Sequence, residues 1–71
     1  MNAETLSEVL KRSPFEPFQV LMSSGEVHEI RHPEFAMATP GRLVIADPAT
    51  ERIAILSMFH ITELRMLQPA A

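Results

Sequence analysis

The segment from residue 17 to residue 35 constrains the fold of this chain more than any other part of it. Two stretches rich in strand-forming residues flank a Ser-Ser-Gly sequence at 23–25, and Pro33 closes the segment. Such stretches around a short loop that contains glycine predict a β-hairpin, and a proline is typical of a strand end. The chain is therefore expected to fold around a β-sheet.

The register of this hairpin depends on the length of its loop. A two-residue loop leaves Ile30 opposite Gln19, whereas a three-residue loop gathers more apolar side chains on one face. The longer loop also puts Gly25 at the left-handed position that such loops require. We therefore expect the pairs Met22–Glu26, Val20–His28 and Phe18–Ile30.

Length and composition indicate a single small domain over residues 1–71. Hydrophobic residues make up 46% of the chain, which is typical of a globular protein. A domain of this size is marginally stable on its own, and the chain has no cysteine for a disulfide or a thiolate zinc site. Very good packing or self-association is therefore expected to stabilise it.

The spacing of apolar residues predicts one helix followed by five strands. Leu6, Val9 and Leu10 form one apolar stripe of a helix over residues 3–12, which ends before Pro14. Strands are predicted at about 17–22, 26–32, 42–47, 52–57 and 61–67. The predicted fold class is mainly β with one N-terminal helix, in a small five-stranded antiparallel barrel.

The segments between and within these strands carry further expectations. One helical turn is expected at 33–35 and a tight turn at 58–60, and residues 36–39 lead to a turn at Pro40-Gly41. Residues 52–57 are almost continuously apolar, which predicts a strand covered on both faces. Residues 68–71 are expected to fray.

The order of the predicted elements resembles the Sm-like (SH3-like) small barrel over roughly residues 3–67. In the rings that Sm-like proteins form, the strands corresponding to 52–57 and 61–67 pair between subunits. RNA-binding members usually carry an Asp and an Asn after the second strand and an Arg-Gly pair before the fifth. The corresponding segments here, 32–37 and 57–60, contain neither element.

Three short motifs resemble those of small uncharacterised bacterial proteins. These are Pro-Phe-x-Pro-Phe at 14–18, Ser-x-Gly at 23–25 and Arg-His-Pro-Glu-Phe at 31–35. The resemblance implies a shared fold and a bacterial origin, and it transfers no activity to this chain.

The histidines are the first candidates for chemistry. His28 and His32, followed by Glu34, have the donor types of a zinc site. Residues four apart on a strand lie about 13 Å apart, too far for one ion unless the corner at Pro33 folds His32 back. We therefore expect His28 to be half-buried and His32 to bond the backbone of the corner, without a metal.

A catalytic site is not indicated elsewhere. His60 precedes the last predicted strand, and Glu63 points to the opposite side of that strand, so no acid orients this imidazole as a general base. No serine stands in a nucleophile elbow or beside a histidine in the sequence. The sequence therefore predicts neither an enzyme nor a cofactor.

Arginines and phenylalanines suggest a possible interaction surface. If the arginines gather at one rim, they make with Phe35 or Phe59 a stacking platform for single-stranded nucleic acid. Alternatively the arginines pair with glutamates across strands and contribute little. The residues of this surface are Arg31, His32, Phe35, Arg42, Phe59 and His60.

The function expected from the sequence is a non-enzymatic interaction module that self-associates or binds a protein partner. The alternative is an Sm-like RNA-associated regulator, which the net charge of −3 disfavours. The acidic start of the chain is unlike a signal peptide, and no apolar run approaches a membrane span. A cytoplasmic location without membrane contact is therefore expected.

Overall fold

A computed structural model describes residues 1–67 of the chain, so the expected fraying at 68–71 lies outside the described residues. Within them the structure has one α-helix, six strands and two 3₁₀ helices. In chain order these elements are α1 (Ala3–Leu10), β1 (Phe18–Met22), β2 (Val27–Ile30), η1 (Pro33–Phe35), β3 (Ala36–Ala38), β4 (Arg42–Asp47), β5 (Arg52–Ser57), η2 (Met58–His60) and β6 (Ile61–Met66).

Helix α1 begins at a side-chain cap. The Asn2 side chain accepts a hydrogen bond from the Thr5 backbone N–H at 2.8 Å, which satisfies one free donor of the first turn. The helix ends at Leu10, two residues earlier than predicted, and Lys11 is its C-terminal cap. Leu6 and Val9 are buried, as the predicted stripe requires, whereas Leu10 is only half-buried.

The first sheet has the strand order β2-β1-β6 and contains the predicted hairpin. Phe18 lies opposite Ile30 and Val20 opposite His28, so the predicted register is confirmed. Gly25 has a φ of 95°, which confirms the predicted left-handed position in the loop.

The second sheet has the order β3-β4-β5. Its strand β3 was not predicted, because a three-residue Ala-Met-Ala segment has almost no β propensity of its own. Pairing with β4 makes it a strand, since Ala36 lies opposite Ile45 and Ala38 opposite Leu43. The bounds of β4 and β5 agree with the predicted 42–47 and 52–57.

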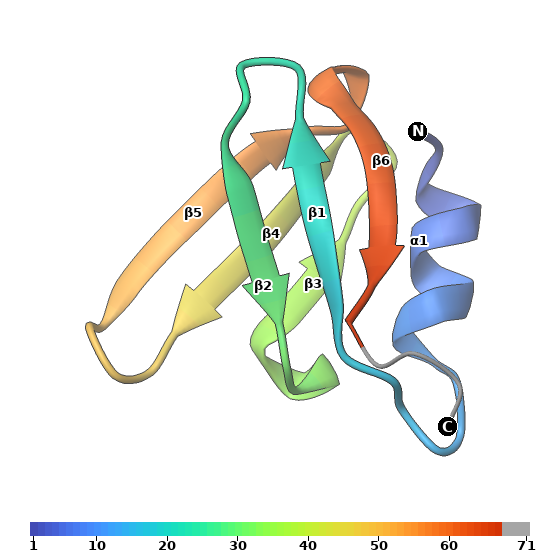
Figure 1. Cartoon of the computed structure of the whole chain (residues 1–71), viewed down its shortest axis with the longest axis vertical. Helices are drawn as coiled ribbons and strands as arrows, with labels where there is room; N and C mark the ends of the chain where they lie inside the picture. Colours follow the sequence, from blue (N-terminus) through green and yellow to red (C-terminus); the bar gives the residue numbers. More distant parts are fainter. Residues whose placement is uncertain (68–71) are drawn as a thin grey trace.

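The predicted five-stranded barrel is wrong. Among residues 1–67 the six strands form two separate three-stranded sheets, although the chain is mainly β with one N-terminal helix as expected. The barrel stays open because η1 separates β2 from β3 and η2 separates β5 from β6, and no strand of one sheet pairs with a strand of the other within residues 1–67. Two short links connect the sheets, η1 between β2 and β3 and η2 between β5 and β6 (Figure 1).

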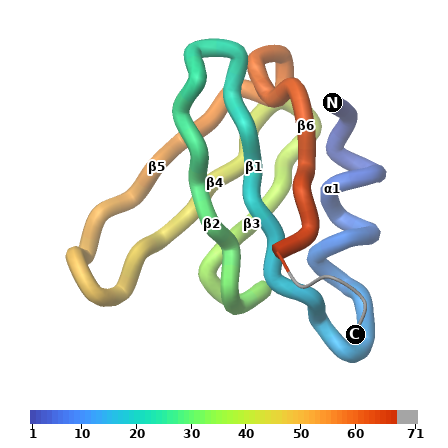
Figure 2. The backbone as a smooth tube through the Cα atoms, in the orientation of Figure 1, coloured from blue at the N-terminus to red at the C-terminus, as the bar shows by residue number. Residues whose placement is uncertain are grey.

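The core lies between the two sheets. Its fully buried side chains come from α1 and from both sheets, and they are Leu6, Phe18, Val20 and Leu43. Helix α1 contacts β3 and lies on the side of β6, away from the β4–β5 hairpin (Figures 1 and 2). The hairpin tip at residues 48–51 thus extends on the side that α1 leaves uncovered. No helix within residues 1–67 is both long and apolar enough to cross a membrane.

Candidate functional site

Strand β5 is an edge of the second sheet, and no other strand of residues 1–67 pairs with its outer side. It is six residues long and pairs with β4 on one side without a break in register. Proteins usually blunt such an edge with lysine, proline, a bulge or a very short strand. From residue 53 to residue 57 β5 has no charged residue and no proline, whereas β3, the other edge of this sheet, has only three residues.

The outer face of the same sheet is apolar except at one end, where Arg42 lies opposite Ser57. Met37 lies opposite Val44, Val44 opposite Ile55, and Ala46 opposite Ile53, so these residues share the face that points away from the core. We call this set, Met37, Val44, Ala46, Ile53 and Ile55, the outer apolar patch. Ile53 and Ile55 are 68% and 66% exposed, so the expected cover on both faces of residues 52–57 is absent among residues 1–67.

The free backbone groups of β5 can be assigned from its ladder. The Met58 N–H donates to the Gly41 carbonyl oxygen at 3.0 Å, and these residues lie opposite each other in the β4–β5 register. Hydrogen-bonded and non-hydrogen-bonded pairs alternate along an antiparallel ladder. The N–H and C=O groups of Ile53 and Ile55 therefore point away from β4, toward the free edge.

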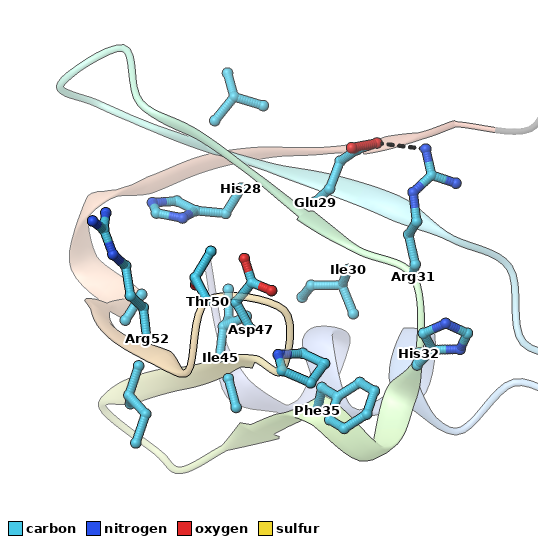
Figure 3. Close-up of a pocket in the computed structure, with 15 residues that line it drawn as sticks. His28, Glu29, Ile30, Arg31, His32, Phe35, Ile45, Asp47, Thr50 and Arg52 are labelled. Atoms are coloured by element: carbon cyan, nitrogen blue, oxygen red, sulfur yellow. Dashed lines mark hydrogen bonds and ion pairs between the residues drawn. The ribbon is translucent and has the colours of Figure 1, made fainter.

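A cleft of about 640 Å³ opens between β2 and the β4–β5 hairpin, and we call it the corner cleft (Figure 3). His28 and Ile30 face it from β2, because they lie on the same side of the first sheet as the buried Val20 and Phe18. Ile45 and Ala54 line the opposite wall. The 3₁₀ helix η1 contributes Phe35, so apolar side chains form most of the lining.

Polar side chains surround this apolar lining. Asp47 comes from the end of β4, Thr50 from the hairpin tip and Arg52 from the start of β5. The His28 Nε2 atom is shielded from solvent and has no hydrogen-bond partner in the described part of the chain. The nearest carboxylate oxygen, Glu26 Oε1, is 3.8 Å away, which is too long for a hydrogen bond. His28 is half-buried, as predicted.

The structure divides the six predicted surface residues between two places. Arg31, His32 and Phe35 all line the corner cleft. The rings of His32 and Phe35 are 5.8 Å apart in an edge-to-face arrangement. Arg31 Nη2 donates to Glu29 Oε1 at 2.9 Å, so its charge already has a partner.

The other three predicted residues lie near η2, at the opposite end of the molecule from η1 (Figure 1). Arg42 and Phe59 line a second hollow of about 460 Å³ beside Met1 and Asn2. Phe59 is 91% exposed, and its ring lies 6.3 Å from that of His60. The six residues therefore do not make one continuous platform.

One contact at this end was not predictable from sequence spacing. Ser23 Oγ lies 3.3 Å from His60 Nδ1, and the Ser23 N–H donates to the His60 carbonyl oxygen at 2.7 Å. A catalytic serine–histidine pair needs an acid that orients the imidazole. No carboxylate within residues 1–67 forms an ion pair with His60, so this contact fixes the hairpin loop against η2.

Three of the five arginines, Arg12, Arg31 and Arg65, pair with a nearby glutamate, but not across strands as expected, whereas Arg42 and Arg52 have no such pair within residues 1–67. Arg65 Nε donates to Glu63 Oε2 at 3.0 Å on the same strand, as Arg31 does to Glu29. Exposed pairs of this kind add little stability, yet they neutralise the cations that a phosphate backbone would need. The part of the chain described, residues 1–67, has no cluster of three or more side chains that could hold a metal ion.

No known protein family, curated protein or solved structure matches this chain. The functional proposal is therefore based on the geometry of the chain alone.

Proposed function

We propose that this protein is a non-enzymatic interaction module that self-associates by pairing β5 of one copy with β5 of another. The observation that carries the proposal is the free β5 edge, which combines backbone groups that no strand of residues 1–67 pairs with and two highly exposed isoleucines. An exposed edge of this kind is a template for strand addition.

The β5 edge is complementary to a second copy of itself. In an antiparallel pair centred on Ala54, Ile53 of one copy lies opposite Ile55 of the other, and the converse pair forms by symmetry. Because Ile53 and Ile55 direct their backbone groups to the free edge, both pairs exchange hydrogen bonds. A pair centred on Ile55 would instead place Ile53 opposite Ser57 and lose one apolar contact, so we favour the first register.

Comparison with the neighbouring strand shows why pairing is favourable. Val44 lies on the same outer face as the two isoleucines, yet it is half-buried because β3 and β5 flank it on both sides. A second β5 strand gives Ile53 and Ile55 the same lateral cover. Cross-strand pairs of β-branched residues each contribute about 0.2–1 kcal/mol.

The interface is small, so the association is expected to be weak. Interfaces below about 1,200 Å² are typical of transient complexes. Dissociation constants in the range of about 1–100 μM correspond to roughly 5–8 kcal/mol of binding free energy. The dimer should therefore dissociate on dilution.

Static light scattering with two matched variants tests the proposal. Ile55→Lys puts a charge on the free edge and is expected to reduce the mass of the wild-type protein to that of a monomer. Val27→Lys changes a residue that is 52% exposed on the other sheet and is expected to leave the dimer intact. Both sites are exposed, so both variants should fold. A wild-type monomer at about 100 μM, the upper end of this range, or equal effects of the two variants, would contradict self-association through β5.

A further inference from the structure

The corner cleft has the size of a small-molecule site and is open on one side of the molecule. Sites that bind small molecules usually measure about 300–1,000 Å³ and combine an apolar lining with a few polar groups. The corner cleft, at about 640 Å³, falls in this range. Ile30 and Ile45 form its floor and are almost fully buried, at 2% and 9% exposure.

An unpartnered polar atom stands on the wall of this cleft. Most buried polar atoms in proteins have a hydrogen-bond partner, because burying one without a partner is unfavourable. His28 Nε2 has none within residues 1–67. His28 lines the cleft, so a ligand that turns the imidazole ring toward the cavity would give this nitrogen the partner that it lacks.

Arg52 provides a second free group beside it. Its cross-strand neighbour is Asp47, but Asp47 Oδ1 accepts a hydrogen bond from the Ala49 N–H at 3.0 Å. Arg52 has no ion pair with any carboxylate of residues 1–67. In Figure 3 its guanidinium and the His28 ring point toward each other from opposite walls of the cleft.

We propose that the corner cleft binds a small carboxylate that carries an aliphatic body. A guanidinium and an imidazole N–H are the donors that recognise a carboxylate, and the guanidinium can bind both oxygens. The aliphatic body lies on Ile30, Ile45 and Ala54. Arg31, which also lines the cleft, is already paired with Glu29. This site lies within one copy of the chain and does not require the proposed self-association.

Nuclear magnetic resonance titration with sodium octanoate tests the proposal, with octan-1-ol as the uncharged probe of equal chain length. Octanoate is expected to shift the methyl signals of Ile30, Ile45 and Ala54, and to bind at least about tenfold more tightly than octanol. Arg52→Gln is expected to remove most of that advantage and to leave octanol binding unchanged. Arg65→Gln removes an exposed arginine on β6 and should change neither affinity.

The titration has clear contradicting outcomes. Equal affinity for the two probes, shifts confined to the outer apolar patch, or unchanged octanoate binding in Arg52→Gln would each overturn the site. Repeating the titration in Ile55→Lys separates the two proposals. Octanoate affinity should be the same in this variant, and its loss there would place the binding site at the dimer interface and contradict the proposal.

Discussion

Gly25 is the residue at which backbone conformation matters most. Its φ of 95° lies in a region that residues with a Cβ rarely adopt. A Cβ added at this position would meet no atom within 4 Å, so the requirement for glycine comes from the backbone and not from crowding. The loop also depends on it, because the Gly25 N–H donates to the Met22 carbonyl oxygen at 2.9 Å.

Gly25→Ala is therefore expected to lower the free energy of unfolding by about 1–2 kcal/mol, the strain of a left-handed residue with a Cβ. Gly41→Ala is the matched control, since Gly41 has no positive φ and also has open space around it. That control should stay within about 0.5 kcal/mol of the wild type. Urea unfolding measures both, and equal losses in the two variants would refute the backbone argument.

At the scale of elements, α1 contributes to the core through one fully buried leucine. Leu6 has no exposed surface, whereas Leu10 at the end of the helix is half-buried. An eight-residue helix is unstable by itself in water, so its packing on β3 and the core must hold it in place. The two leucines therefore differ in what their loss costs.

Leu6→Ala is expected to cost about 2–4 kcal/mol, because it removes a buried side chain and leaves a cavity. Leu10→Ala should cost less than half as much, since water already reaches that side chain. Thermal or urea unfolding of the two variants gives the comparison. A larger loss for Leu10→Ala would mean that α1 packs through a different face.

Helices and strands could be predicted where the residues that determine them lie close together in the sequence. The hairpin register followed from loop length and Gly25, and β4 and β5 followed from apolar runs bounded by turn residues. Strand β3 was not predictable, because Ala36–Ala38 becomes a strand only through its pairing with β4. The helix was predicted two residues too long, since Lys11 is in the cap and not in a helical turn.

At the scale of the molecule, residues 1–67 form two sheets that share one core, and the edges of these sheets are covered to different extents. Helix α1 lies over one side, whereas the corner cleft and the β5 edge remain open. The helical turn at 33–35 was expected, but the closed barrel was inferred from the number of strands, and the sequence does not show which strands pair. The sequence also suggested that the six predicted surface residues lie together. The structure places three of them near η1 and three near η2, and this separation depends on the tertiary structure.

The two candidate sites were also hard to predict, because each depends on how segments far apart in the sequence lie in the fold. The sequence shows that residues 52–57 are mostly apolar. It does not show that they are exposed, because exposure depends on whether another strand of residues 1–67 lies beside β5. The corner cleft is lined by both His28 and Arg52, which come from two segments that only the fold brings together. The sequence thus indicated the apolar character of the β5 edge, but neither its exposure nor the corner cleft.

Amide hydrogen exchange at β5 tests the central claim, pairing of the β5 edge with a second copy, most directly. The N–H groups of Ile53 and Ile55 point to the free edge, whereas those of Ala54 and Leu56 bond to β4 and act as internal standards. At low protein concentration Ile53 and Ile55 should exchange quickly, and at high concentration their exchange should slow toward that of the standards. Fast exchange of both amides at every concentration would contradict the account.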